Sequence, residues 1–238
     1  MNTKVILFDL DGTLLPLNQD VFMQEYFGGL AKKMAPYGYQ PEKLIETIWL
    51  GTKAMVKNDG KKTNEEVFWD VFASVYGDEA KAHEKVFEEF YKTDFQKVKK
   101  STSFNEKSQK TIEELNKLGF KMALATNPLF PRIATESRIK WAGVEKDYFK
   151  LITTYENSRH CKPNPEYYLD IAKFLNVHPQ ECLMVGNDVT EDMIAKEVGM
   201  KVFLITDCLI NKEGKDISSY PQGNFDKLIS YIKSLKRA

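Results

Sequence analysis

Two carboxylates, Asp9 and Asp11, stand two residues apart where the first apolar run of the sequence ends. They belong to the segment Asp9-Leu10-Asp11-Gly12-Thr13, which directly follows a β-branched and aromatic run at residues 4–8. Carboxylates can act as nucleophiles, as general acids or bases, and as ligands of hard metal ions. Open α/β sheets bind ligands at the carboxyl ends of their strands, so this pair predicts a ligand site directly after the first strand.

Three later segments carry further candidate groups. Thr126-Asn127 and the segment 186–192 (Gly-Asn-Asp-Val-Thr-Glu-Asp) each follow an apolar run, and Lys162-Pro163-Asn164-Pro165 precedes a helical pattern. The sequence places Lys162 36 positions after Thr126, and Asp188 26 positions after Lys162. Each interval is about the length of one strand and one helix. Each of these three later segments alone is a weak signal.

The aspartates of these segments should converge at the carboxyl edge of the sheet: Asp9, Asp11, Asp188 and Asp192. Two like charges ~4 Å apart repel by on the order of 4 kcal/mol at an effective dielectric constant of 20, so the cluster needs a cation. Oxygen ligands favour Mg²⁺ over zinc or copper. No competing histidine or cysteine spacing occurs among His83, His160, His178, Cys161, Cys182 and Cys208. We therefore expect a carboxylate site for Mg²⁺, structural or surface histidines, and reduced thiols.

Five short apolar runs should form the strands that position these groups: residues 4–8, 121–125, 151–154, 182–185 and 201–205. Segments of helical periodicity separate the strands. One apolar stripe begins at Tyr168 and another at Phe225, and each should face the sheet. Strands that alternate with helices imply a parallel sheet, so the sequence predicts an α/β fold.

The segment from about Leu17 to Lys100 shows helical periodicity and no convincing strand. Thr63 and Glu66 have the spacing of a capping box, which marks the start of a helix. A βαβ unit needs only ~30 residues, so an excess of roughly 80 residues precedes Thr126. We interpret this excess as a nearly four-helix module whose aromatic residues form its own core. The predicted domains are a core of residues 1–16 and 100–238 and a helical domain of residues 17–99.

The composition excludes several classes of protein. The 34 Lys and Arg residues balance the 34 Asp and Glu residues, so the chain lacks the basic character of a nucleic-acid-binding protein. Hydrophobic residues make up 42% of the chain, which is enough for a core and argues against disorder. No apolar stretch approaches the ~20 residues of a membrane span, and Asp9 and Asp11 interrupt any secretory signal. We therefore expect a cytoplasmic protein with no membrane partner.

Taken together, the four segments resemble the motifs of the haloacid dehalogenase superfamily, whose first motif reads D-x-D-G-T after the first strand. The resemblance covers residues 1–16 and 100–238, and residues 17–99 match only in position and helicity. An insertion at this point in the family is a helical cap that closes over the active site and selects the substrate. The resemblance implies a Rossmann-like three-layer core with a central parallel sheet, plus a small all-helical cap domain.

This resemblance also assigns roles to the candidate residues. Asp9 would be the nucleophile that forms an aspartyl-phosphate, and Asp11 the general acid and base. Thr126 would donate to the transferring phosphoryl oxygens, and Lys162 would offset negative charge. The implied phosphate-binding set is Asp11, Gly12, Thr126, Asn127 and Lys162. The implied metal ligands are Asp9, Asp11 through its backbone carbonyl, Asp188 and Asp192; because Asn187 stands where many members place an acid, Asp192 could act directly or through water.

The function implied by the resemblance is a Mg²⁺-dependent phosphatase that hydrolyses a small phosphorylated metabolite. Carbon–halogen hydrolysis is not expected, because the family's dehalogenases lack an acid at the position of Asp11. Two alternatives stay open: a phosphomutase of the same superfamily, and a phospho-accepting regulatory protein without turnover. The sequence identifies neither the substrate nor the oligomeric state. Lys53, near a turn expected at Gly51, is one cap residue that could contact the substrate.

Overall fold

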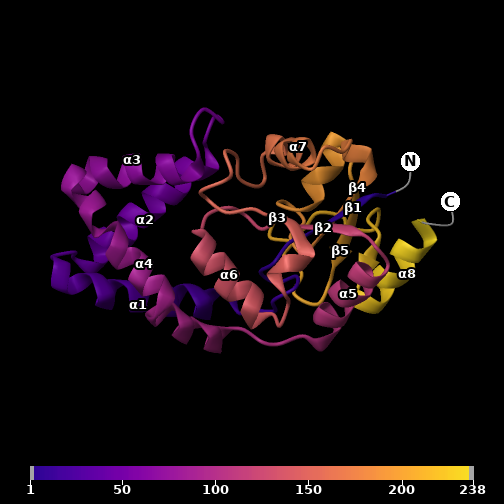
Figure 1. The fold of residues 1–238 in the computed structure, drawn as a ribbon, viewed down its shortest axis with the longest axis horizontal. Coiled ribbons are helices and arrows are strands. Elements are labelled where there is room, and N and C mark those ends of the chain that lie inside the picture. Colours follow the sequence, from indigo (N-terminus) through magenta and orange to yellow (C-terminus); the bar gives the residue numbers. More distant parts are fainter. Residues whose placement is uncertain (1–2, 236–238) are drawn as a thin grey trace.

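A parallel sheet forms the centre of the structure, a computed structural model that describes residues 3–235 (Figure 1). Within these residues the sheet has six strands in the order β3-β2-β1-β4-β5-β6. The order reverses on either side of β1, so the carboxyl end of β1 lies at the point where open α/β sheets bind ligands. The strands are β1 (Val5–Phe8), β2 (Lys121–Leu124), β3 (Phe149–Ile152), β4 (Cys182–Gly186), β5 (Lys201–Ile205) and β6 (Gln222–Gly223).

The predicted α/β fold with a parallel sheet is confirmed, although some boundaries differ. The strand expected at residues 151–154 begins earlier, because Phe149 is buried and pairs with Met122 of β2. β6 was not predicted, since two residues are too few to show a strand pattern. Between β4 and β5 the chain forms a 3₁₀ segment, Met193–Val198, in place of a full α-helix.

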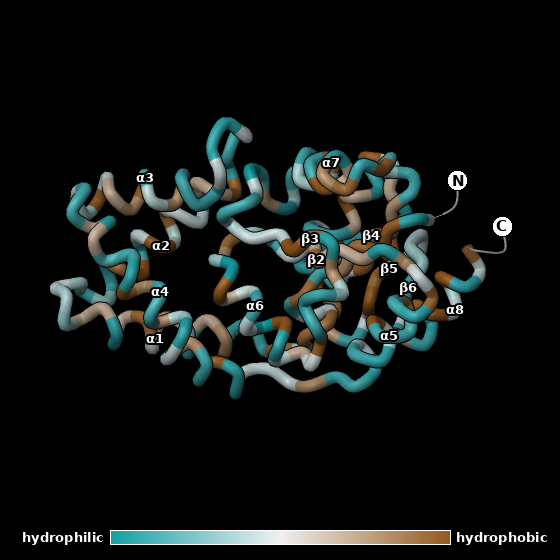
Figure 2. Tube along the Cα trace, in the orientation of Figure 1, coloured by the Kyte–Doolittle hydropathy of each residue, from teal (hydrophilic) through white to brown (hydrophobic). Residues whose placement is uncertain are grey.

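Helices cover both faces of the sheet. α5 (Glu106–Lys117), α6 (Arg132–Trp141) and α8 (Phe225–Leu235) contribute to one hydrophobic core, and α7 (Pro165–Phe174) contributes to the other. β1 supplies both cores with alternate residues, as expected of a buried parallel strand. Figure 2 shows the most hydrophobic residues concentrated along the strands. Among residues 3–235, none of the helices combines the length and the apolar character that crossing a membrane requires.

A helical lobe is inserted between β1 and β2, and it lies beside the sheet (Figure 1). It contains α1 (Gln19–Met34), α2 (Pro41–Val56), α3 (Asn64–Tyr76) and α4 (Glu84–Lys92). The expected capping box starts α3: Thr63 Oγ1 accepts a hydrogen bond from the Glu66 N–H, and the Glu66 carboxylate accepts one from the Thr63 N–H. Phe72 and Phe90 are fully buried in the lobe. The helical insertion expected from the sequence is therefore confirmed.

The lobe joins the sheet part of the molecule through two adjacent chain segments. Leu17 and Thr102 form an antiparallel bridge, and the Ser103 N–H donates to the Pro16 carbonyl at 2.8 Å. On the opposite side, the start of α3 contacts the loop that follows β3. There the Asn64 N–H donates to the Ser158 carbonyl at 2.8 Å. The lobe is thus held to the sheet part both at its connections and at α3.

Candidate active site

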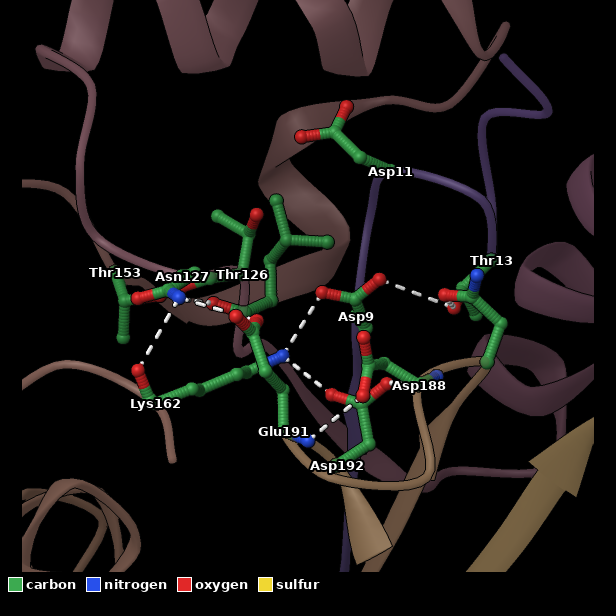
Figure 3. Close-up of polar contacts among 12 residues, drawn as sticks. Asp9, Asp11, Thr13, Thr126, Asn127, Thr153, Lys162, Asp188, Glu191 and Asp192 are labelled. Atoms are coloured by element: carbon green, nitrogen blue, oxygen red, sulfur yellow. Dashed lines mark hydrogen bonds and ion pairs between the residues drawn. The ribbon is translucent and has the colours of Figure 1, made fainter. Parts of the chain in front are cut away.

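Three strand ends and one loop bring the predicted site residues to a single edge of the sheet (Figure 3). Phe8, at the end of β1, pairs with Leu124 of β2 and with Val185 of β4. The residues that follow these strands therefore begin at the same level. Asp9 follows β1, Thr126 follows β2, and Asp188 follows β4. Lys162 reaches this edge from the loop before α7, and its ammonium group lies among the carboxylates.

Lys162 is the buried centre of the site, with 1% of its surface exposed. Its Nζ donates to Asp9 Oδ1 at 2.8 Å and to Asp192 Oδ1 at 2.6 Å. Burial acts to lower the pKa of Lys162, but Asp192 and Asp9 outweigh it and hold that pKa well above its usual value of 10.5. Lys162 therefore stays charged and fixes the Asp9 carboxylate in one orientation.

Replacing Lys162 with Met should destabilise the protein strongly. Asp9 and Asp192 would then be buried without their cation, and breaking a buried ion pair in this way costs about 3–5 kcal/mol. The free energy of unfolding, measured by urea titration in EDTA, should fall by that amount. Lys173→Met, at an exposed position on α7, is the matched control and should change the free energy little. A Lys162→Met protein as stable as the control would contradict this reading of the ion pairs.

The turn after Asp9 is held by Thr13 and Asn187. Thr13 Oγ1 lies 3.1 Å from Asp9 Oδ2 and 2.9 Å from Asn187 Oδ1, and its single proton serves one of them at a time. The Asn187 amide donates to the Cys208 carbonyl at 2.6 Å. Gly12 has a φ of +83°, and a Cβ there would lie 2.3 Å from Asn187 Nδ2. Asn187 therefore connects the segment 186–192 with the turn of residues 9–13, which explains why an amide stands at this position.

Asp188 and Asp192 face different partners. Both Asp192 oxygens are occupied, since Oδ1 accepts from Lys162 and Oδ2 accepts from the Asp188 N–H at 2.9 Å. Burial raises the pKa of Asp192 to about 6, against the opposing effect of Lys162. Asp188 Oδ1 accepts from the backbone N–H groups of Thr190 and Glu191 at 2.8 and 2.9 Å. Of the four carboxylate oxygens of Asp188 and Asp192, only Asp188 Oδ2 has no hydrogen bond among the described residues.

The Asp11 side chain points away from Asp9 and Lys162 (Figure 3). One oxygen, Oδ2, forms an ion pair with Arg138 Nη1 of α6, whose side chain is 1% exposed. The other oxygen, Oδ1, is buried and has no hydrogen-bond partner among residues 3–235. Burial raises the pKa of Asp11 above its usual 3.8, and Arg138 opposes that shift. Asp11 is thus held by Arg138 at one oxygen, and its side chain, which is 30% exposed, lines the cavity between the lobe and the sheet.

Arg138 is a site residue that the sequence reasoning missed. Its guanidinium carbon lies 4.5 Å from the centre of the Phe130 ring, and its Nη2 donates to Thr135 Oγ1 at 3.2 Å. A signal for it does exist in the sequence. Ala134, Arg138 and Trp141 share the buried side of α6, so a charged residue interrupts an otherwise apolar stripe.

The four carboxylates reach one edge of the sheet, as expected, but their side chains do not form a single cluster, because Asp11 turns to Arg138 and Asp192 is occupied by Lys162. In the part of the chain that the structure describes, no three His, Cys, Asp or Glu side chains are arranged to hold a metal ion together. The donor chemistry still suits Mg²⁺, which needs only one or two carboxylates because it keeps several waters and binds substrate phosphate. Asp9 and Asp188 are the two side chains that fit this role.

Four further residues singled out from the sequence are Thr126, Asn127, His160 and Lys53. Thr126 is buried, and its carbonyl accepts from the Tyr167 hydroxyl at 2.8 Å. The Asn127 amide donates to Glu191 Oε2 at 3.1 Å, and burial raises the pKa of Glu191 to about 7. His160 Nδ1 lies 2.7 Å from Asp170 Oδ2, as expected of a structural histidine. Lys53 is exposed and does not line the cavity described next.

A cavity of about 390 Å³ lies between the helical lobe and the carboxyl edge of the sheet. Asp9, Asp11, Thr126 and Asp188 line it from the sheet side, and aromatic residues of α1 to α4 line it from the lobe. Phe22 and Tyr26, two of the aromatic residues expected to be lobe core, are indeed buried but also line this cavity. Its volume lies within the range usual for small-molecule sites, ~300–1,000 Å³.

Comparison with known proteins identifies the family of this chain and solved structures of the same fold. The model of the family described as "Haloacid dehalogenase-like hydrolase" matches residues 6–205. Pyrophosphatase PpaX of Bacillus cereus is 23% identical over 206 residues, which are 87% of this chain and 84% of that protein. The HAD phosphatase of Thermococcus onnurineus aligns with a TM-score of 0.58 at 21% identity, over 97% of this chain and 98% of that one. A 2-haloacid dehalogenase of Pseudomonas syringae aligns with a TM-score of 0.61 at 18% identity, over 99% and 100%. At these identities the structural likeness shows the fold alone.

Proposed function

Since this chain belongs to the haloacid dehalogenase-like hydrolases, we propose that it is a Mg²⁺-dependent phosphatase of a small phosphorylated metabolite. The observation that carries the proposal is the placement of the two acids of the first motif. Asp9 is fixed by a buried lysine, and the side chain of Asp11, which is 30% exposed, lines the same cavity. A nucleophile beside a separate proton donor is what phosphomonoester hydrolysis requires.

The proposed reaction uses both acids in turn. An Asp9 oxygen attacks phosphorus and forms an aspartyl-phosphate, while Asp11 gives its proton to the departing alkoxide. Asp11 then takes a proton from water, whose oxygen attacks phosphorus and releases inorganic phosphate and free Asp9. Lys162 balances negative charge on Asp9 before the attack and on the phosphoryl group afterwards. Thr126 would donate to the phosphoryl oxygens, so that developing charge meets fixed donors.

The proposed metal ligands are the carboxylates of Asp9 and Asp188 and the backbone carbonyl of Asp11. When bound, Mg²⁺ would offset charge on the phosphoryl group and orient it toward Asp9. Asp192 acts differently in this proposal, because both of its oxygens are occupied. It positions Lys162 and the backbone of Asp188, and it contacts the metal only through water.

The test is release of inorganic phosphate from a panel of phosphomonoesters. Activity should vanish with EDTA and return with Mg²⁺, while Ca²⁺ should inhibit because its larger, looser coordination shell places the reacting atoms poorly. Transfer of the phosphoryl group back to an alcohol would identify a phosphomutase. Uptake of one phosphate per chain without turnover would identify a regulatory protein, and either result would overturn the proposal.

The metal assignment makes a separate prediction for Asp188→Asn. Because Mg²⁺ binds only the folded site, a hundredfold excess over Kd should stabilise the wild-type protein by about 2.7 kcal/mol. For a chain of this size the melting temperature should rise by roughly 5–10 °C. Asp188→Asn should lose most of this rise, and Asp147→Asn, at an exposed position, should keep it. Equal Mg²⁺ shifts in the two variants would mean that Asp188 does not bind the metal.

A further inference from the structure

The helical lobe contributes no charged side chain to the cavity. Among the described residues, 13 from positions 17–99 line it, and all are uncharged. Eight of these 13 are Phe, Tyr or Trp, and they come from α1, α2, α3 and α4. Every charge at the cavity therefore belongs to the sheet side, where the phosphoryl group would bind. The part of the substrate that leaves with the alcohol faces aromatic rings.

The charges on the sheet side are mostly negative. Two cations line the cavity, Arg138 and Lys212, within the part of the chain that the structure describes. Arg138 is buried and paired with Asp11, and Lys212 is exposed. A second anionic group on a substrate would thus lie among aromatic rings and carboxylates, and it would lose its hydration without gaining a buried cation.

Two hydroxyls of the aromatic wall satisfy each other, and the buried Trp69 Nε1–H has no hydrogen-bond partner among the described residues. The hydroxyls of Tyr26 and Tyr91 lie 3.0 Å apart and share a hydrogen bond. Burial raises the pKa of Tyr26 to about 12, so this hydroxyl is neutral at physiological pH. Trp49 lines the cavity although 51% of its surface is exposed, and its ring centre lies 5.5 Å from that of Phe27. Such a wall offers contact area to a flat ring and little to a charged group.

We propose that the substrate is a phosphomonoester whose alcohol carries an uncharged ring, and that phosphate or a carboxylate is disfavoured as the leaving part. This inference rests on the proposed phosphatase function, and it specifies the substrate class of the same site. It separates this chain from a pyrophosphatase such as PpaX, for which the leaving group would be a second phosphate. Burial of one ring against this wall should favour ring-bearing ligands by roughly 30- to 100-fold.

The first experiment measures binding without turnover, using two phosphonates whose C–P bond resists hydrolysis. 2-Phenylethylphosphonate carries a ring where 3-phosphonopropionate carries a carboxylate, each two methylenes from phosphorus. In calorimetry with Mg²⁺ present, the ring compound should bind the wild-type protein at least ~30-fold more tightly. Equal affinity, or tighter binding of the carboxylate compound, would overturn the inference. This result holds whether or not the protein is a phosphatase.

The second experiment compares kcat/KM for 2-phenylethyl phosphate, a nucleoside 5′-monophosphate, glycerol phosphate and pyrophosphate. The two ring-bearing esters should exceed the other two, and the better of the pair shows whether the ring is a nucleobase or a simple aryl group. Preference for pyrophosphate or glycerol phosphate would overturn the inference while upholding phosphatase function. Phosphate release from none of these or other esters, with the phosphonate preference intact, would overturn the phosphatase function alone.

A gain-of-function variant provides a sharper test. Thr52 lines the cavity from α2, whereas Leu50 on the same helix is 51% exposed and does not. Thr52→Lys should tighten binding of 3-phosphonopropionate by roughly tenfold, because the new cation can pair with the carboxylate. Leu50→Lys adds the same charge outside the cavity and should leave both affinities unchanged. Equal effects of the two variants would show that the lobe wall does not contact the leaving part of the substrate.

Discussion

The Asp9→Asn protein is expected to fold and to release phosphate at less than about a thousandth of the wild-type rate. An amide nitrogen or oxygen at this position cannot form the aspartyl-phosphate, and removal of a nucleophile disables the remaining groups that act with it. Folding should survive because Lys162 keeps its ion pair with Asp192 at 2.6 Å. Phosphate release under single-turnover and steady-state conditions measures the loss.

The Asp9 prediction needs a fold check and a charge control. Circular dichroism and the melting temperature establish that the variant is folded, and Asp147→Asn removes an exposed carboxylate without touching the site. The control should retain wild-type activity. Residual release of more than a few per cent by a folded Asp9→Asn protein would falsify the assignment of Asp9 as the nucleophile.

The Asp11→Asn protein should lose about 10²–10⁴-fold in kcat for alkyl phosphates, because no acid protonates the departing alkoxide. Nitrophenyl phosphate should lose much less, since its leaving group departs without a proton. Asp11 suits this role because burial raises its pKa, which increases its protonated fraction at a given pH. The measurement is the ratio of wild-type to variant kcat for 2-phenylethyl phosphate and nitrophenyl phosphate.

The Asp11→Asn variant should preserve the contact with Arg138, so it separates a catalytic from a structural role of Asp11. In the Asp11→Asn protein the side-chain amide oxygen can still accept a hydrogen bond from Arg138, so the turn should keep its shape and KM should change little. A merely structural role for Asp11 predicts equal losses for both substrates. If the alkyl and nitrophenyl esters suffer alike, Asp11 is not the acid, and another group must be sought along the same cavity wall.

Residues that directly follow strands were the most predictable part of the site. The run that ends at Phe8 is apolar and β-branched, and the turn residues Asp9 to Thr13 follow it without a gap. Such local signals place a side chain at the edge of a sheet, because the carboxyl ends of parallel strands share one edge. The same reasoning positions Thr126 and Asp188. The parallel sheet and the inserted helices were equally predictable from periodicity.

Side-chain direction was not predictable, because it depends on partners far away in the sequence. Asp11 turns toward Arg138, 127 positions later, and Asp192 turns toward Lys162, 30 positions earlier. The aromatic residues of the lobe posed the same problem. A stripe such as Phe22 and Tyr26 shows that one helix face is covered, but not whether protein or a ligand covers it. Only the packing of α1 against the other elements separates these cases.

The pairing of Leu17 with Thr102 has a consequence for how such a protein diversifies. Because the Ser103 N–H donates to the Pro16 carbonyl at 2.8 Å, the two ends of the insertion lie side by side, as the ends of a short loop would. Segments inserted at such adjacent points can be replaced or lost with little effect on the fold that hosts them. The residues of the proposed phosphoryl-transfer site and the residues proposed to face the alcohol can therefore change independently over evolution, so descendants can acquire new substrates while inheriting the same chemistry.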